Sequence, residues 1–464
     1  MTVRIAGGQG FYGDDVASTR PLLESGIDYL CLEGLAELTL AILQKDRQRD
    51  ESLGFNRDLP RYLKIALPFV GDGRTKVITN AGGINPIAAG RAAIDTARAL
   101  GLSGLKIATV VGDDLTARLG ALHEAGVNLD NAETGESWDD FAAAHGGAGA
   151  PAMLFASAYL GVAPIVEALR AGADVVITGR VADSALFLAP LVHEFGWAPD
   201  DWDRLAAGTA VGHLAECSGQ STGGNFSGEW WTVPEPWNFG FPIAECEPDG
   251  TAVLTKAPGT GGRVDFDTVR HQLLYEVHDP AAYLAPDVVA DFTSIELTEV
   301  GPDRVRLTGC KGLPATPTYK ALIAYETGWA GETRVAFAWP DAYAKATATA
   351  AIFRRRVALA GHRAEEWHEE YWGVNALGGP TVPLDAADDA PDVSLRIAWR
   401  CPDAASAAAI AREMVPLGLS APPWGLTASG RTVIGKPSQL LGLWPALVDK
   451  ALVDTSVRVA IEEV

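Results

Sequence analysis

Cysteine is scarce in this sequence, and the cysteines present lie far apart. The 464 residues include five cysteines, and no two of them form a C-x-x-C pair. They are Cys31, Cys217, Cys246, Cys310 and Cys401. A disulfide framework or a zinc ribbon needs cysteines at regular, close spacings, so neither is expected. The composition instead suits the reducing cytoplasm, where we expect the protein to work.

Long apolar runs and clusters of basic residues are also missing. No apolar stretch reaches the roughly 18–20 residues of a membrane span. The first residues, MTVRIAGGQGFYGDD, do not resemble a secretory signal. The net charge is −22, and the one basic run is Arg354–Arg356. Nucleic acids and membranes are therefore not expected as partners, because phosphate binding needs clustered Lys and Arg. A small anionic ligand is not excluded, since a few local cations suffice to hold one.

Size and composition predict several folded domains. The chain of 464 residues is longer than one ordinary core supports, and 48% hydrophobic with 21% charged residues is typical of a folded soluble protein. The character changes after Phe226, where tryptophans and prolines crowd together. We predict a Rossmann-like parallel α/β domain over residues 1–228, an α+β domain over 229–385 and a small C-terminal α/β subdomain over 386–464.

The clearest structural pattern starts at Ile165. Residues 165–171 have helical apolar spacing, Gly172 ends that helix, and residues 175–178 are a short β-branched run of the kind buried on both faces of a sheet. Another helix follows. This succession indicates a parallel sheet, in which ligands bind at the carboxyl ends of the strands. The residues expected at that edge are Thr178, Arg180, Asp183 and Ser184.

Two further segments predict strands of the same sheet. Residues 22–37 align without a gap with residues 168–183, which indicates one helix–glycine–strand unit used twice. Residues 76–111 give a strand, a glycine loop, a helix that starts at the Asn85-Pro86 pair, and a strand. Such a crossover makes the two strands parallel. We therefore expect the strand ends near residues 33, 80 and 180 to converge on one pocket.

A glycine-rich loop is predicted directly after a first strand at Val3–Ala6. Gly8, Gly10 and Gly13 have the G-x-G-x-x-G spacing of a dinucleotide site. The preceding strand is short, so we favour a tight turn or an anion-binding nest over a nicotinamide site.

Several long motifs, in the same order, are similar to those of one known family. They are ITNAGGINP at 78–86, VVGDDL at 110–115, ADVVITGRVADSAL at 173–186, GHLAECSGQSTGGNF at 212–226, GFPIAE at 240–245 and DTVRHQLLYEVHDPAAYLAPDV at 267–288. Over most of residues 4–450 the chain resembles the acyclic terpene utilisation (AtuA) family, N-terminal domain. The resemblance implies a cytosolic protein of branched, terpenoid-derived acid catabolism, with coenzyme A thioesters as substrates. It also implies a setting shared with acyl-CoA carboxylase subunits. It supplies no list of catalytic residues.

Acidic residues follow each predicted strand and are candidates for proton transfer. Closely placed carboxylates raise one another's pKa, which is how a general acid or base is made, and oxygen ligands also suit Mg²⁺. The alternatives are helix-start acids and solvated loop charges. Arg180 is a candidate cation for a carboxylate, phosphate or thioester oxygen, or else an ion-pair partner of Asp183 or Glu37. The acidic candidates are Glu33, Glu37, Asp113, Asp114 and Asp183.

Two loops and one helix end complete the candidate site. Backbone N–H groups around Asn80, Gly82, Gly83 and Asn85 would suit an oxyanion, or else these residues form only a turn and a cap. His213, Glu216 and Cys217 would share a helix face, as a Cys–His nucleophile, as part of a metal site or as an ordinary helix end. Gln220, Thr222 and Asn225 are expected ligand donors in the loop that follows.

These observations predict an enzyme, a lyase or hydratase that acts on a branched acyl-CoA. We expect its site in a cleft between the Rossmann-like half and the α+β half. The sequence leaves open a non-catalytic partner or ligand carrier of an acyl-CoA carboxylase system, and a nicotinamide-dependent oxidoreductase. The expected ligand is an acyl-CoA, with Mg²⁺ as an alternative cofactor, and we expect a homo-oligomer.

Overall fold

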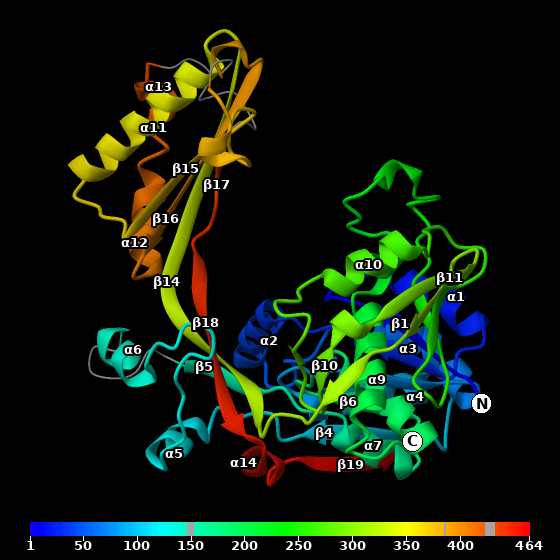
Figure 1. Ribbon diagram of the computed structural model, residues 1–464. Coiled ribbons are helices and arrows are strands. Elements are labelled where there is room, and N and C mark those ends of the chain that lie inside the picture. The colour runs from blue at the N-terminus through cyan, green and yellow to red at the C-terminus, as the bar shows by residue number, and fades with distance from the viewer. Residues whose placement is uncertain (146–152, 385–386, 423–431) are drawn as a thin grey trace. The chain divides into compact units, whose positions relative to one another are not determined.

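The computed structural model describes residues 1–145, 153–384, 387–422 and 432–464, which form two compact units (Figure 1). Unit 1 contains residues 1–144, 153–324 and 443–464, and unit 2 contains residues 325–442 together with His145. The units divide the chain neither at residue 228 nor at residue 385, so they differ from the domains predicted from the sequence.

Unit 1 is built on five parallel strands. In spatial order these are β1 (Val3–Gln9), β2 (Tyr29–Leu32), β3 (Lys76–Thr79), β6 (Val175–Thr178) and β4 (Lys106–Val111). Nearly every residue of β2, β3 and β6 is buried, which explains the short apolar runs in the sequence. The mixed α/β class and the parallel sheet are therefore confirmed.

The order of these strands was not predicted. The helix α4 (Pro86–Ala99) links β3 to β4 as expected, and Asn85 caps it by accepting a hydrogen bond from the Ala88 N–H. Strand β6, however, lies between β3 and β4. The first strand has β2 as its one parallel neighbour, whereas a Rossmann sheet is ordered 3-2-1-4-5-6 with its first strand inside. A Rossmann-like arrangement is therefore not confirmed.

Antiparallel strands extend this sheet on both sides. Beside β1 lie β7 (Pro242–Cys246), β8 (Ala252–Lys256), β12 (Arg304–Thr308) and β11 (Glu296–Gly301), and beside β4 lies β19 (Arg458–Glu463). Ile5 of β1, for example, pairs with Ala244 of β7. The segment after residue 228 thus contributes strands to the first sheet, which is why the predicted division there fails to match a compact unit.

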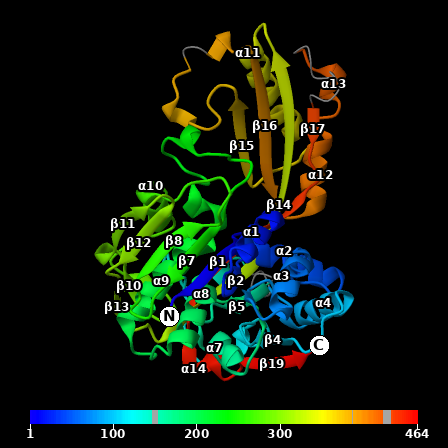
Figure 2. The ribbon, with the colours of Figure 1, turned by 90° about the vertical axis from the view of Figure 1, so that its right-hand side faces the viewer.

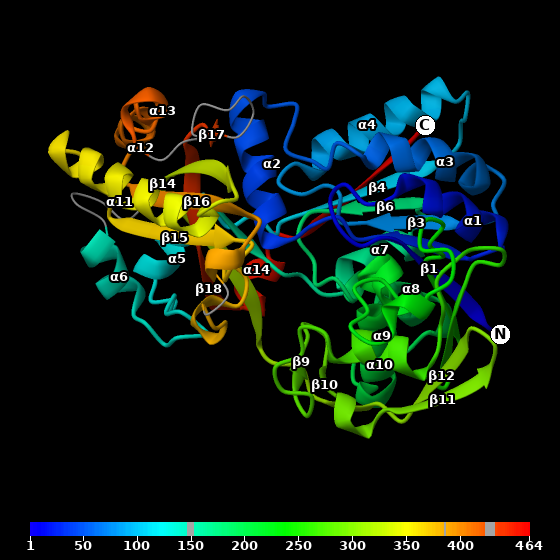
Figure 3. The ribbon, with the colours of Figure 1, turned by 90° about the horizontal axis from the view of Figure 1, so that it is seen from above.

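Helices cover both faces of the sheet in unit 1 (Figure 3). On one face α1 (Thr19–Glu24), α3 (Leu59–Gly71) and α4 share an apolar core with β2, β3 and β6. On the other face lie α7 (Ala163–Arg170), α8 (Ala185–Phe195) and α9 (Trp202–Glu216). The remaining elements of unit 1 are α2 (Glu37–Arg49), α5 (Leu119–Glu124), α6 (Trp138–His145), β5 (Met153–Ala158), α10 (Phe266–Leu274), β9 (Tyr283–Leu284), β10 (Val289–Asp291), β13 (Lys311–Leu313) and α14 (Lys450–Asp454).

The repeated unit seen in the sequence is present in the fold. Gly26 follows α1 with φ +76° and Gly172 follows α7 with φ +85°, the left-handed conformation that favours glycine after a helix. The strands that follow, β2 and β6, flank β3 on its two sides. The unit therefore delivers Glu33 and Arg180 to neighbouring positions of one sheet edge.

Unit 2 is an antiparallel sheet covered by helices on one face (Figure 2). Its sheet order is β15 (Glu366–Trp372), β16 (Asp392–Cys401), β14 (Thr318–Ala338) and β17 (Thr432–Ile434). With α11 (Ala342–Leu359) after β14 and α12 (Ala404–Arg412) after β16, the succession β-α-β-β-α-β gives a ferredoxin-like unit. Its other elements are α13 (Leu417–Ser420) and β18 (Ser438–Asp449), the second of which continues into unit 1.

None of the helices in the described ranges has both the length and the apolar character that crossing a bilayer demands.

Candidate functional site

The carboxyl ends of the parallel strands in unit 1 carry the polar residues predicted from the sequence. Glu33 follows β2, Asn80 follows β3, Arg180 follows β6 and Asp113 follows β4. All four are less than one-tenth exposed. Because these strands are adjacent, residues from four distant segments form one polar cluster, which we call the edge cluster.

Arg180 is at the centre of the edge cluster. Its side chain is 3% exposed, and Nη1 donates to Oδ1 of Asp183 at 2.5 Å. The guanidinium carbon lies 4.0 Å from the centre of the Tyr159 ring, a cation–π arrangement. Nε has no hydrogen-bond partner among the described residues. The ion pair with Asp183, one of the two alternatives for Arg180, is therefore formed, and one buried donor is left over.

Glu37 begins α2 beside this arginine. Its Oε1 accepts a hydrogen bond from the Tyr159 hydroxyl at 2.7 Å, and Lys320 Nζ lies 3.8 Å away. Burial alone would raise the pKa of Glu37, but the hydrogen bond from Tyr159 and the charges of Arg180 and Lys320 lower it overall. Glu37 is therefore an ionised carboxylate at neutral pH.

The pKa of Glu33 is shifted in the opposite direction. Its Oε1 accepts hydrogen bonds from Asn80 Nδ2 at 2.8 Å and from the Leu35 N–H at 2.7 Å. Burial and the nearby charge of Asp183 nevertheless raise the pKa of Glu33 well above its ordinary value. The side-chain oxygen of Asn80 accepts a hydrogen bond from the Gly34 N–H at 2.8 Å. Asn80 thus fixes the turn after β2 and is not free to bind a ligand.

Asp113 joins the ends of β4 and β6. Its Oδ2 accepts from the Arg180 N–H at 2.8 Å and from the Ser157 hydroxyl at 2.9 Å. A Cβ at Gly179 would lie 2.4 Å from Asp113 Oδ1, so glycine is needed there. Burial raises the pKa of Asp113 to about 6. Asp113 therefore titrates close to neutral pH.

His213 and Glu216 form a buried pair at the end of α9. His213 Nδ1 lies 3.2 Å from Glu216 Oε1, and Nε2 lies 3.0 Å from the Gln272 carbonyl oxygen. Because a carbonyl only accepts, Nε2 carries a proton. Burial raises the pKa of Glu216 to about 7, and the charge of Asp183 adds to this effect. The second oxygen of Glu216 is buried and has no partner among the described residues.

Close packing brings this pair next to the edge cluster. A Cβ at Gly212 would lie 2.7 Å from the Cα of Ser184, which adjoins Asp183. A Cβ at Gly7 of β1 would lie 2.1 Å from the Ala215 carbonyl oxygen. Small residues therefore let α9 approach both β1 and the start of α8.

Cys217 lacks the character of a nucleophile. Burial raises the pKa of its thiol, and the charge of Glu216 raises it further. The thiolate is the reactive form of cysteine, so a buried thiol of this kind is inert. The hypothesis of a Cys–His nucleophile is not supported.

The glycine loop after β1 also differs from the expectation. The strand continues to Gln9, so Gly8 lies within it, and a Cβ there would meet the Leu30 side chain at 2.6 Å. The Gly10 N–H donates to Asp14 Oδ2 at 2.8 Å, and the Ser218 hydroxyl donates to the same oxygen. Gly8 and Gly10 are needed for close packing. The Asp14 carboxylate accepts the hydrogen bonds at the place where a dinucleotide phosphate would bind.

In the loop from Asn80 to Asn85, the N–H groups of Gly83, Ile84 and Asn85 donate to backbone carbonyl groups of the protein. The N–H of Gly83 donates to the Asn80 carbonyl, and that of Asn85 to the Gly82 carbonyl. A Cβ at Gly82 would lie 2.4 Å from the Thr178 carbonyl oxygen. The turn-and-cap alternative therefore describes this loop, and its N–H groups are not arranged as an oxyanion hole.

The polar loop after α9 is likewise joined to its own surroundings. Gln220 Nε2 donates to Gln272 at 2.9 Å, and Asn225 Nδ2 donates to Gln220 at 2.9 Å. The Thr222 hydroxyl donates to the Gly240 carbonyl at 2.7 Å. These three predicted ligand donors link α10 and the segment before β7 to the loop after α9.

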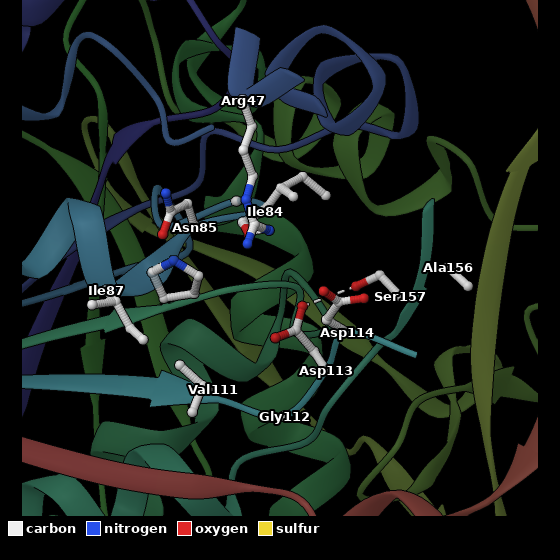
Figure 4. Close-up of a pocket in the computed structure, with 12 residues that line it drawn as sticks. Arg47, Ile84, Asn85, Ile87, Val111, Gly112, Asp113, Asp114, Ala156 and Ser157 are labelled. Atoms are coloured by element: carbon white, nitrogen blue, oxygen red, sulfur yellow. Dashed lines mark hydrogen bonds between the residues drawn. The ribbon is translucent and has the colours of Figure 1, made fainter. Parts of the chain in front are cut away.

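A pocket of about 170 Å³ opens beside the edge cluster (Figure 4). Asp113 and Asp114 stand on one side of it, and Arg47 of α2 reaches in from the opposite side. The rest of its wall is mostly apolar and comes from Gly83, Ile84, Asn85, Pro86, Ile87, Val111, Gly112, Ala156 and Ser157. Throughout the described ranges, no group of three or more His, Cys, Asp or Glu side chains is arranged to hold a metal ion.

Three site residues escaped the sequence analysis. Ser157 lies in β5 and Tyr159 follows that strand, which pairs with β14. Arg47 lies in the last turn of α2. No local pattern marks them, because each reaches the site through contacts between distant segments.

Comparison with known proteins gives one result. Neither the curated proteins nor the solved structures contain a match to this chain. The family model described as acyclic terpene utilisation family protein AtuA matches residues 3–459. This is nearly the whole chain, so the protein belongs to the AtuA family of acyclic terpene utilisation.

Proposed function

We propose that the protein is an enzyme of branched, terpenoid-derived acid metabolism that acts on an acyl-CoA thioester as a lyase or hydratase. The observation that carries the proposal is the buried Arg180 of the edge cluster, which has the ionised carboxylate of Glu37 and protonatable carboxyls around it. Family membership supplies the metabolic context.

The cluster has the parts that such chemistry needs. A base removes the proton from the carbon next to the thioester carbonyl, and the electron pair moves onto the carbonyl oxygen to give an enolate. Glu37 suits the base, because its carboxylate is ionised. The Nε–H of Arg180, which has no hydrogen-bond partner among the described residues, is suited to donate a hydrogen bond to the enolate oxygen. For dehydration, a protonated carboxyl such as Asp113 gives its proton to the departing hydroxyl, and hydration is the reverse.

Turnover of purified protein with a panel of branched acyl-CoA thioesters tests the proposal. We expect Glu37→Gln to lower kcat by about a hundred- to ten-thousandfold, the usual contribution of a general base. Asp183→Asn should also lower turnover, because it changes the charge next to Arg180. Asp203→Asn is the matched control, since this aspartate pairs with Lys311 on an exposed part of α9.

Two outcomes contradict the proposal. Equal turnover of the Glu37→Gln variant and the wild type removes Glu37 as the base. Absence of turnover with every thioester, together with co-purification of a carboxylase subunit, favours the non-catalytic partner. A nicotinamide enzyme has less support, because Gly8 lies inside a strand and Gly10 binds Asp14.

A further inference from the structure

The pocket at the carboxyl end of β4 has a chemistry of its own. It contains about 170 Å³, the space of roughly six water molecules at about 30 Å³ each. Ile84, Ile87 and Val111 line it together with Arg47, Asn85, Asp113, Asp114 and Ser157. A compact apolar body of about that many heavy atoms fills such a space better than water does.

Arg47 supplies the pocket's cation. Within the described residues its one hydrogen bond runs from Nη1 to the Ile84 carbonyl oxygen at 2.8 Å, and it has no carboxylate partner there. Its aliphatic stem rests on Gly54, where a Cβ would lie 3.0 Å from Arg47 Cβ. The guanidinium is therefore held in place while most of its N–H donors remain unspent.

A second, more open hollow meets the pocket at this arginine. It contains about 500 Å³ and is lined by Gln44, Arg47, Gln48, Glu51 and Asn85. Arg47 and Asn85 line both spaces. Arg47 is thus reachable from outside and from the inner pocket, as a residue at an entrance would be.

The N–H groups at the start of α4 do not supply a contact to an anion in the pocket. Asn85 already caps this helix with its own side chain. Opposite Arg47, Asp113 and Asp114 face the pocket (Figure 4). Two carboxyl groups repel a dianion more strongly than a monoanion, so the pocket suits a carboxylate better than a phosphate.

We propose that this pocket binds a small carboxylic acid, with its carboxylate on Arg47 and a compact apolar body against Ile87 and Val111. The inference goes beyond the proposed function, because a free carboxylate on Arg47 is not the thioester on which Glu37 and Arg180 would act, and neither of those residues lines this pocket. Its test measures binding alone, so it can fail or succeed independently of turnover.

Calorimetric titration of the full chain with 3-methylbutanoate tests the inference. We expect one saturable site, and Arg47→Gln should weaken it about tenfold or more, because a charge-assisted hydrogen bond is lost. Arg49→Gln is the matched control: it lies on the same helix but outside the pocket lining. A thermal melt of each variant reports whether it is folded.

A second pair of variants tests the apolar wall. Ile87 is 51% exposed at the start of α4, and Ile42 is 42% exposed on α2. Ile87→Glu should weaken binding about tenfold or more, because it removes an apolar contact and adds a third carboxylate to those of Asp113 and Asp114, whereas Ile42→Glu should leave the dissociation constant unchanged. Equal effects of the two substitutions overturn the proposed position of the ligand.

Two further probes test the ligand class. The uncharged 3-methylbutan-1-ol should bind at least tenfold more weakly than the acid, and so should inorganic phosphate. Tighter binding of phosphate overturns the choice of a monoanion, and equal binding of the alcohol overturns the role of Arg47. Saturable binding that obeys all these expectations supports the site even if no acyl-CoA is turned over.

Discussion

Arg180 in unit 1 and Arg396 in unit 2 both pair with carboxylates, but in different surroundings. The Arg180 side chain is 3% exposed and its pair lies at the end of a parallel sheet. The Arg396 side chain is 25% exposed and bonds Glu332 and Glu370 at 2.8 Å each, on the face of an antiparallel sheet. Helices pack on the opposite face of that sheet.

The difference shows in which part of the molecule ionic groups are buried at a cost in folding free energy. Burying ionic groups costs several kcal/mol each unless they are paired and hydrogen-bonded. The exposed pairs of unit 2 keep much of their hydration, so they cost little and contribute little. The edge cluster of unit 1, with buried carboxyls of raised pKa around one arginine, is the place where a functional reason for that cost is needed.

The largest expected effect compares the two arginines directly. Arg180→Met removes the cation beside the buried Glu33 and beside Asp183, whose side chain is 32% exposed, so the free energy of unfolding should fall by about 3 kcal/mol. Arg396→Met should lower it by about 1 kcal/mol or less. Urea unfolding of both variants measures the two changes, and equal losses would end the distinction between the units.

Packing gives the next effect. Gly7→Ala puts a methyl group 2.1 Å from the Ala215 carbonyl oxygen, and we expect a loss of about 1–3 kcal/mol. Gly435→Ala in unit 2 meets the exposed Glu332 side chain at 3.1 Å, which can move, so the loss should stay within about 0.5 kcal/mol. Urea unfolding of this pair shows whether α9 is as closely held against β1 as the structure indicates.

The pH dependence of stability should have opposite signs in the two units. Burial raises the pKa of Glu216 from its ordinary 4.5 to about 7, so the folded chain binds this proton more tightly than the unfolded chain. Its contribution to stability is present below pH 4.5 and is lost as the pH rises to about 7. Burial alone would raise the pKa of Glu370, but Trp372 and Arg396 lower it overall, so its contribution is lost as the pH falls below 4.5.

Unfolding curves between pH 4 and 8 measure both contributions. Glu216→Gln should flatten the decline between pH 5 and 7, by up to about 1.4 kcal/mol per pH unit. Glu370→Gln should flatten the rise on the acid side and leave that decline intact. A Glu216→Gln variant with an unchanged slope would show that Glu216 does not titrate in this range.

The smallest expected effect is on the rate of thiol alkylation, which should be low in both units. Burial raises the pKa of all five cysteines, among them Cys217 in unit 1 and Cys401 in unit 2. Native protein should therefore react slowly with iodoacetamide at pH 8, and denaturant should release all five thiols together. Rapid native labelling of Cys217 would restore the nucleophile that its burial argues against.

The sequence located the parallel strands well. Residues 175–178, 76–79 and 106–111 are strands as predicted, because strands buried on both faces must be continuous apolar runs. The first strand was predicted too short, since Gly7 and Gly8 resemble a loop but serve as contact points for α9 and Leu30. The parallel pattern also placed Glu33, Asn80 and Arg180 at one edge of the sheet, but none of the three lines the pocket on which they were expected to converge.

The roles of the polar loops were less predictable. Asn80, Gln220 and Asn225 have the composition of a ligand loop, yet their amides bond to their own chain. Their partners lie up to 52 residues away. Composition identifies a hydrogen-bonding group but does not identify what it bonds.

The sequence by itself determined which segments are buried strands and which polar residues stand at their ends, because burial on both faces admits only apolar side chains. The tertiary structure alone decided that β6 lies between β3 and β4, and that strands after residue 228 complete the same sheet. It also decided that Arg180 meets Tyr159 and that Arg47 faces Asp113 across a pocket. These outcomes depend on contacts between segments far apart in the chain, and no local pattern encodes them.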